Sequence, residues 1–183
     1  MKKKLGISLS SRVILYAPTW RDNNYDIKAG YQSFENLLDD KSFLDGLSDT
    51  VFLFRGHYFT KLSKKSSSFI DVSSHNSIND LMLVSDCLIT DYSSLFFDYA
   101  ILKKPIYFYM PDLETYRDSV RGFYFDISSG LPGTISFNLE QLKETINTAP
   151  NLPKIEEFNK VFNGLEDGDS TKRLLIKLGL CNE

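Results

Sequence analysis

The sequence predicts an α/β fold in which a doubly wound parallel sheet carries helices on both faces. Short continuous apolar runs alternate with segments of helical periodicity, which is the order expected of repeated strand–helix units. The connections are short, and neither an internal repeat nor a low-complexity linker interrupts this order. Hydrophobic residues make up 42% of the 183 residues, enough for the core of one generous domain or of a fragment of a two-domain protein.

The strands of the predicted sheet are continuous apolar runs, typical of parallel strands buried on both faces. The first run, Val-Ile-Leu-Tyr-Ala, ends at Pro18, which cannot continue a ladder of hydrogen bonds. Another follows Pro105 after a turn of two lysines. The predicted strands are residues 13–17, 51–54, 69–72, 87–90 and 106–109.

The predicted helices rest on apolar spacing and on capping residues at their starts. Ser77 with Asp80 resembles a capping box that opens a helix through Val84, and Asn138 with Gln141 can cap another. The predicted helices are residues 34–47, 78–84, 95–102, 112–121, 139–146, 155–162 and 171–178. We therefore expect a single domain over residues 1–183, with a core at 13–150 and C-terminal helices at 151–183.

Composition excludes several classes of function. The formal net charge of −3 argues against general nucleic-acid binding, which requires a strongly basic face. The two cysteines show no Cys-x-x-Cys or Cys/His ligand spacing, so we expect no metal site and no cofactor, and a reducing cytosolic setting. No apolar run approaches the length needed to cross a bilayer.

Polar and basic residues follow the ends of the predicted strands. In doubly wound sheets ligands bind beyond the carboxyl ends of the strands, so these residues are expected to converge on one rim. The segments at that rim are Pro18–Arg21, Arg55–His57, Asp71–Ser74 and Thr90–Ser94.

The most informative segment is residues 86–100, where a buried strand stops at hydroxyl residues that open a helix. The first amide groups of a helix lack intrahelical partners and attract anions, and Ser93 and Ser94 add hydroxyl donors. These residues, grouped with Thr90, predict a diphosphate site. Asp98, one helical turn further on, is placed to accept hydrogen bonds from ribose hydroxyls, the alternative being an exposed helix residue.

Four more residues are candidates for phosphate chemistry. His57, at the rim, can donate to a phosphate oxygen or to a departing phosphate, although a loop histidine is also compatible with a surface or packing role. Arg121 can grip a diphosphate with two hydrogen bonds beside Gly122, the alternative being an ion pair with Asp118 or Glu114. Arg55 and Arg21 are weaker candidates for substrate binding.

Several motifs in order resemble those of the CDP-glycerol:poly(glycerophosphate) glycerophosphotransferase family, the teichoic-acid primases and polymerases. The resemblance spans about residues 13–178. It implies the C-terminal, donor-binding half of a glycosyltransferase-B fold, while the acceptor half has no counterpart in this chain. One local departure is Arg55-Gly-His57-Tyr58, where the family usually reads Lys-x-His-Pro. The segments that carry the resemblance are Tyr16–Arg21, the strand end near His57, Asp86–Ala100, Lys104–Tyr109, Asp112–Tyr116, Arg121–Gly122 and Asp167–Gly168.

By this resemblance, the hydroxyl of a teichoic-acid or capsule-type polymer attacks the β-phosphorus of CDP-glycerol and CMP leaves. His57 is then the expected catalytic residue, and the remaining candidates bind substrate. The resemblance also implies a cytoplasmic location, either free or bound peripherally to the inner face of the cell membrane. Three alternatives stay open: a nucleotide-binding module inactive without an acceptor-domain partner, a transferase using CDP-ribitol or a related polyol, and the donor half of a sugar-nucleotide transferase.

Overall fold

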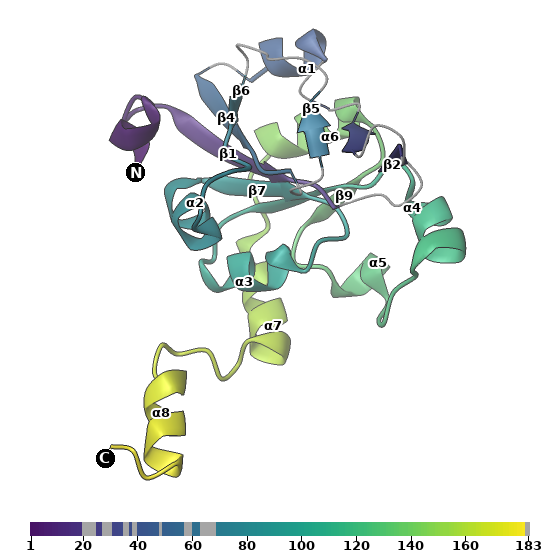
Figure 1. The fold of residues 1–183 in the computed structure, drawn as a ribbon. Coiled ribbons are helices and arrows are strands. Elements are labelled where there is room, and N and C mark those ends of the chain that lie inside the picture. The colour runs from purple at the N-terminus through teal and green to yellow at the C-terminus, as the bar shows by residue number, and fades with distance from the viewer. Residues whose placement is uncertain are drawn as a thin grey trace.

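The computed structural model describes residues 1–19, 25–26, 31–34, 37, 40–47, 49–56, 60–62 and 69–181. Its centre is a six-stranded sheet with strand order β6-β4-β1-β7-β8-β9, in which every pairing is parallel (Figure 1). Counted along the chain this is the order 3-2-1-4-5-6 of a Rossmann fold. The strands are β1 (Arg12–Ala17), β4 (Thr50–Phe54), β6 (Phe69–Asp71), β7 (Cys87–Thr90), β8 (Ile106–Tyr109) and β9 (Thr134–Ser136).

A smaller three-stranded sheet has the order β2-β3-β5. Its first pair is antiparallel and its second pair is parallel. The strands are β2 (Tyr25–Asp26), β3 (Tyr31–Phe34) and β5 (Thr60–Leu62).

Helices cover both faces of the large sheet, because side chains alternate in direction along each strand. Along β1, Ile14 and Tyr16 join the core on the side of α1 (Lys41–Asp45) and α6 (Leu139–Asn147). Val13, Leu15 and Ala17 join the core on the other side, with α2 (Ile78–Val84), α3 (Leu95–Ile101) and α7 (Leu152–Phe162). The remaining helical segments are η1 (Lys2–Leu5), α4 (Leu113–Thr115), the π-helical turn η4 (Tyr116–Val120), α5 (Ile127–Gly130) and α8 (Ser170–Lys177).

The predicted fold class and the five predicted strands are confirmed. The helix predicted over residues 34–47 is wrong in extent: 31–34 form β3, and the described helix is the short α1. The side chain of Asp40 caps α1 at its start by accepting from the amide of Phe43, and Gly46 ends it. The sequence reading also missed β9 and α5.

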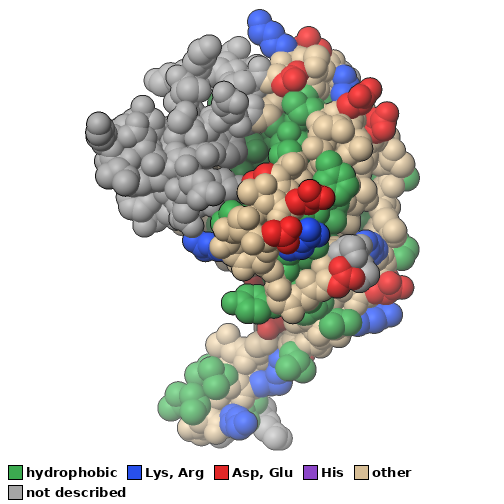
Figure 2. Space-filling view, turned by 90° about the vertical axis from the view of Figure 1, so that its right-hand side faces the viewer, with side chains coloured by type: hydrophobic (Ala, Val, Ile, Leu, Met, Phe, Trp, Pro, Cys, Tyr) green, Lys and Arg blue, Asp and Glu red, His purple; other side chains and the backbone are tan. Residues whose placement is uncertain are grey.

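The C-terminal segment leaves the body of the molecule after α7 (Figure 1). No residue of α8 is buried, and hydrophobic side chains gather on this projection in Figure 2. In the part of the chain that the structure describes, we find no helix with the length and apolarity needed to cross a membrane. The exposed apolar residues on and around α8 are Leu165, Leu174, Leu175, Leu178 and Leu180.

Candidate functional site

The strand order reverses direction between β1 and β7, which is where doubly wound sheets bind ligands. From β1 the chain continues to β4 on one side, whereas β7 leads to β8 on the other. Ala17 and Thr90 are register partners at the carboxyl ends of these two strands. The predicted rim therefore has its centre at this pair.

Hydrogen bonds join the two strand ends directly. The hydroxyl of Thr90, which is fully buried, donates to the carbonyl of Ala17 at 2.7 Å. One oxygen of Asp91, Oδ1, accepts from the amide of Thr19 at 2.8 Å, from the Thr19 hydroxyl at 2.5 Å and from the amide of Tyr92 at 2.6 Å. Asp91 is only 4% exposed, so these donors replace the water that a carboxylate would otherwise require. Asp91 thus orients the turn that follows β7.

That turn presents the two predicted serines in different ways. Ser93 is half-buried, and its hydroxyl oxygen accepts from the amide of Leu95 at 3.3 Å. Ser94 is the exposed N-cap residue of α3, and its side chain makes no capping hydrogen bond. The Ser94 hydroxyl is therefore not committed to its own helix. Asp98 lies exposed in the first turn of α3, where the sequence predicts it.

The arginine loop, residues 121–122, follows the π-helical turn η4. The amides of Arg121 and Gly122 both donate to the carbonyl of Tyr116, each at 3.2 Å. Gly122 has φ of 67°, a left-handed conformation that favours glycine, and a Cβ there would lie 3.3 Å from the carbonyl oxygen of Arg117. Arg121 is exposed beside this turn. The π-helical turn and the left-handed Gly122 together fix the course of the backbone at Arg121.

The alternative that the sequence offered for Arg121 was an ion pair with Asp118 or Glu114. Asp118 instead forms a bidentate pair with Arg117, at 2.7 Å and 2.9 Å. The hydrogen bond from Arg117 holds the pKa of the Asp118 carboxyl below its usual value. The Asp118 carboxylate is thus engaged by its immediate neighbour.

Sequence reasoning missed an aromatic contact between the serine turn and the segment before Arg121. The rings of Tyr92 and Tyr116 stack with centroids 3.7 Å apart and planes within 11°. The Tyr92 hydroxyl donates to Oδ1 of Asp112 at 2.9 Å. Phe123 packs against both rings, at 5.8 Å and 5.6 Å. The sequence signal was present, since aromatic residues flank both motifs, but periodicity alone does not pair residues that are 24 positions apart.

Three of the remaining candidates follow other strands in the sequence, and the structure describes one of them, Arg55. Arg55 follows β4, and its Nη1 donates to the carbonyl of Val72 at 3.0 Å and to that of His75 at 2.5 Å. These bonds fix the segment after β6, and a contact of Arg55 with substrate stays a prediction. His57 and Arg21 lie outside the described residues, so their roles stay predictions as well. Among the described residues, we find no cluster of three or more His, Cys, Asp or Glu side chains that could hold a metal ion.

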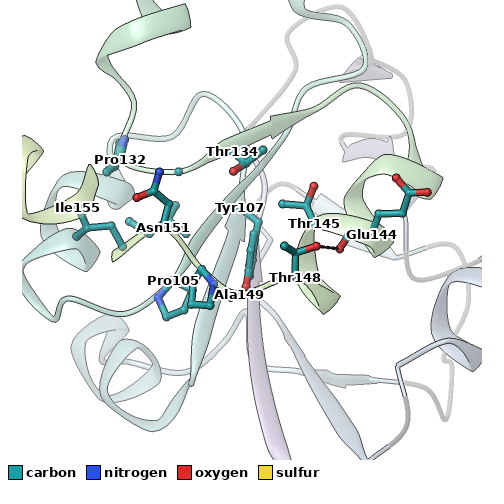
Figure 3. A pocket seen from close by; sticks show the side chains of 13 residues that line it. Pro105, Tyr107, Pro132, Thr134, Glu144, Thr145, Thr148, Ala149, Asn151 and Ile155 are labelled. Atoms are coloured by element: carbon teal, nitrogen blue, oxygen red, sulfur yellow. Dashed lines mark hydrogen bonds between the residues drawn. The ribbon is translucent and has the colours of Figure 1, made fainter. Parts of the chain in front are cut away.

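A pocket of about 270 Å³ lies elsewhere, at the amino ends of β8 and β9 (Figure 3). Its walls include Pro105, Pro132 and Asn151, together with the last turn of α6. Inside it, the hydroxyl of Thr148 donates to the carbonyl of Glu144 at 2.8 Å, the dashed line in Figure 3. This hollow is at the opposite end of the strands from Ala17 and Thr90, so it is distinct from the candidate site.

Comparison with known proteins connects this geometry to one family. The sequence model of the family described as CDP-glycerol:poly(glycerophosphate) glycerophosphotransferase matches residues 1–178. The chain is 42% identical to a teichoic acid poly(glycerol phosphate) polymerase of Bacillus spizizenii, over 97% of this chain and 47% of that protein. It is 40% identical to a teichoic acid glycerol-phosphate transferase of Staphylococcus aureus, over 95% of this chain and 46% of that protein.

Further relatives include a ribitol-phosphate polymerase and a solved structure that supports the fold. The Staphylococcus aureus ribitol-phosphate polymerase TarK is 36% identical over 97% of this chain and 36% of its own length. A structure of a variant of the wall teichoic acid polymerase TagF superimposes with a TM-score of 0.77 and 35% identity, over 98% of this chain and 46% of that one.

The chain thus spans about half the length of the most similar of these relatives. Within that half, the match covers the Rossmann sheet, the serine turn after β7 and the segment that carries Arg121. The chain belongs to the CDP-glycerol:poly(glycerophosphate) glycerophosphotransferase family.

Proposed function

We propose that this chain is the donor-binding half of a glycerophosphotransferase. It would hold CDP-glycerol while glycerol phosphate is transferred to a hydroxyl of a teichoic-acid or capsule-type polymer. The observation that carries this proposal is the arrangement at the switch point. There a turn with two serines, fixed by the buried Asp91, lies at the end of β7, and a π-helical turn tied to it by stacked tyrosines leads to Arg121.

The proposed reaction needs positioned donors more than covalent chemistry. The polymer oxygen forms a bond to the β-phosphorus, the bond from that phosphorus to the bridging oxygen breaks, and CMP leaves. Negative charge builds up on the phosphate oxygens, so fixed hydrogen-bond donors lower the barrier. The hydroxyls of Ser93 and Ser94 and the guanidinium of Arg121 would bind these oxygens, and His57 would donate to the diphosphate or to the leaving phosphate.

The nucleoside would lie along α3. Asp98 is exposed one turn after Ser94, so its carboxylate is available to a ribose whose phosphates lie at the start of this helix. A carboxylate in the first turn also gains from the positive end of the helix dipole. The buried Thr90 would act through the strand contact with Ala17, and direct contact with the donor is the second role we assign to it.

The donor is assigned as CDP-glycerol because the two most similar relatives named above carry glycerol phosphate in their names. The similarity to TarK keeps CDP-ribitol as the second candidate. Because this chain matches less than half of its relatives, a polymer acceptor would be bound mainly by an acceptor domain outside it. We infer that the complete enzyme works at the cytoplasmic face of the membrane, where a membrane-bound polymer acceptor would be within reach.

Calorimetric titration of the chain with CDP-glycerol, CDP, CDP-ribitol and UDP-glucose tests the proposal. We expect CDP-glycerol to bind, UDP-glucose to bind more weakly, and the variants Ser94→Ala and Arg121→Ala to lose roughly tenfold or more in affinity. Ser10→Ala and Arg173→Ala are matched controls, because both residues are exposed, Ser10 precedes the amino end of β1 and Arg173 lies on α8. Binding that is equal in all five proteins would refute the site.

Titration also separates the alternatives. Binding of CDP-glycerol without CMP release, restored to turnover by an added acceptor domain, would identify a module that requires a partner. Tighter binding of UDP-glucose than of CDP would identify a sugar-nucleotide transferase half instead.

A further inference from the structure

Tyr92 connects the serine turn to a distant part of the chain. It lies between Asp91, which fixes the turn, and Ser93, which is proposed to bind phosphate. Its ring stacks face to face on that of Tyr116, with centroids 3.7 Å apart. The stack therefore restrains the side chain that lies between Asp91 and Ser93 in the serine turn.

Tyr116 connects the same contact to the arginine loop. Its ring is 6% exposed under the stack, and its carbonyl accepts the amides of Arg121 and Gly122. One residue thus touches the serine turn with its side chain and the arginine loop with its backbone. The stacked pair, with Phe123 packed against both rings, joins the two proposed phosphate-binding segments.

Asp112 supports the stack in a way that a mere helix cap would not. It is the N-cap residue of α4, a position where an aspartate normally accepts from a backbone amide two or three residues later. Its side chain makes no such bond here, and Oδ1 accepts from the Tyr92 hydroxyl at 2.9 Å instead. The Asp112 carboxylate thus accepts from the Tyr92 hydroxyl and caps no helix amide. This bond helps to fix the orientation of the Tyr92 ring.

We propose that Tyr92, Asp112 and Tyr116 form a clamp that holds Arg121 at a fixed separation from Ser93 and Ser94, so that both segments contact one diphosphate. The three are positioning residues for the donor site and do not touch the donor. The inference rests on the proposed function. A preorganised site binds more tightly because less ordering remains to be done when the ligand arrives.

A double-mutant cycle on CDP-glycerol binding tests whether the clamp acts through Arg121. We expect Tyr92→Leu to weaken binding about tenfold in the otherwise unchanged chain and by less than about twofold when Arg121→Ala is already present. Tyr92→Phe keeps the ring and removes the hydroxyl that donates to Asp112, so it should give a smaller effect of the same kind. Tyr124→Leu is the matched control, because Tyr124 is a fully exposed aromatic residue of the same segment.

A measurement without ligand tests the mechanical connection itself. We expect Tyr92→Leu to speed hydrogen exchange at the amides of Arg121 and Gly122 about tenfold, although these residues are far away in sequence. In the Tyr92→Leu protein, the amides of β1 and β7 should exchange at the same rate as in the unchanged chain. In the Tyr124→Leu protein, the amides of Arg121 and Gly122 should also exchange at the unchanged rate.

The outcomes separate this inference from the proposed function. If Arg121→Ala binds CDP-glycerol as tightly as the unchanged chain, or if the unchanged chain does not bind it, the proposed function fails and the clamp loses its purpose. If Arg121→Ala weakens binding but the effect of Tyr92→Leu simply adds to it, the stack is ordinary packing and the clamp is refuted. Unaltered exchange at Arg121 and Gly122 in Tyr92→Leu would refute it as well.

Discussion

The Oδ1 atom of Asp91 accepts three hydrogen bonds, and the residue is only 4% exposed to solvent. Replacing this residue by alanine would leave the amides of Thr19 and Tyr92 without their acceptor. Buried donors that lose a charged partner cost about 2 to 3 kcal/mol. We expect Asp91→Ala to lower the free energy of unfolding by about that amount, measured by urea denaturation. Asp98→Ala, an exposed carboxylate in the same segment, should change it by less than about 0.5 kcal/mol.

Cys87 gives a prediction about alkaline pH. Burial raises the pKa of its thiol from 9.0 to about 11, against a smaller opposing effect of the Arg12 guanidinium. Since the unfolded chain releases this proton at lower pH, the folded state loses stability between pH 9.0 and about 11. We expect a Cys87→Ala protein to lose less stability over this interval in urea denaturation. An equal loss in both proteins would contradict the prediction.

At the scale of single residues, the sequence was most informative where chemistry is local. Ser94 and Asp98 lie at the start of α3, as predicted, because a strand followed by hydroxyl residues and an apolar helix pattern is a contiguous signal. The role of Tyr92 was out of reach, since its partners Asp112 and Tyr116 become neighbours only when two loops meet. Asp112 itself was read as a helix start, and the structure uses its carboxylate elsewhere.

At the scale of elements, capping residues set the bounds of a helix whose extent apolar periodicity predicted wrongly. Apolar spacing over residues 34–47 fits a helix, but Asp40 and Gly46 confine the described helix to α1, and 31–34 pair with β5. The strand β9 was missed because three residues carry little pattern, and its place comes from pairing with β8. Pro153 lies in the first turn of α7, where proline fits.

The end of the π-helical turn η4 offers a test at this scale. Gly122 has a positive φ, so Gly122→Ala should cost about 1 kcal/mol in stability. It should also weaken CDP-glycerol binding, because the strain falls on the loop that carries Arg121. Gly168→Ala is the matched control: its φ is 91° and it lies in the loop before α8. The prediction fails if the two variants bind the nucleotide equally well, as judged by calorimetry beside thermal unfolding.

At the scale of the whole molecule, the C-terminal projection should be separable from the sheet. No residue of α8 is buried, whereas Ile155 and Phe158 of α7 are 2% and 5% exposed in the core. We expect a chain that ends at Gly164 to unfold within about 2 °C of the full chain, measured by circular dichroism. A chain that ends at Asn151 should unfold more than about 10 °C lower, since it exposes apolar core. A large loss in the shorter deletion would show that α8 stabilises the fold.

The alternation of strands and helices predicted the architecture, because it depends on patterns that each segment carries by itself. The strand order could not be predicted in the same way. Placing β7 beside β1 requires the pairing of Leu15 with Leu88 across more than 70 residues, which composition and spacing do not encode. The resemblance to a family implied the donor-binding half of a glycosyltransferase-B fold, and the Rossmann order of the large sheet agrees with that fold class.

The three hydrogen bonds to Asp91 also bear on the rate at which a ligand can enter. Two of the three donors belong to Thr19, so one carboxylate oxygen ties the segment after β1 to the turn after β7. Separation of these two segments requires that both Thr19 hydrogen bonds to this oxygen break. A ligand that requires these two segments to separate would consequently bind at a rate limited by that opening, which stopped-flow measurements would detect.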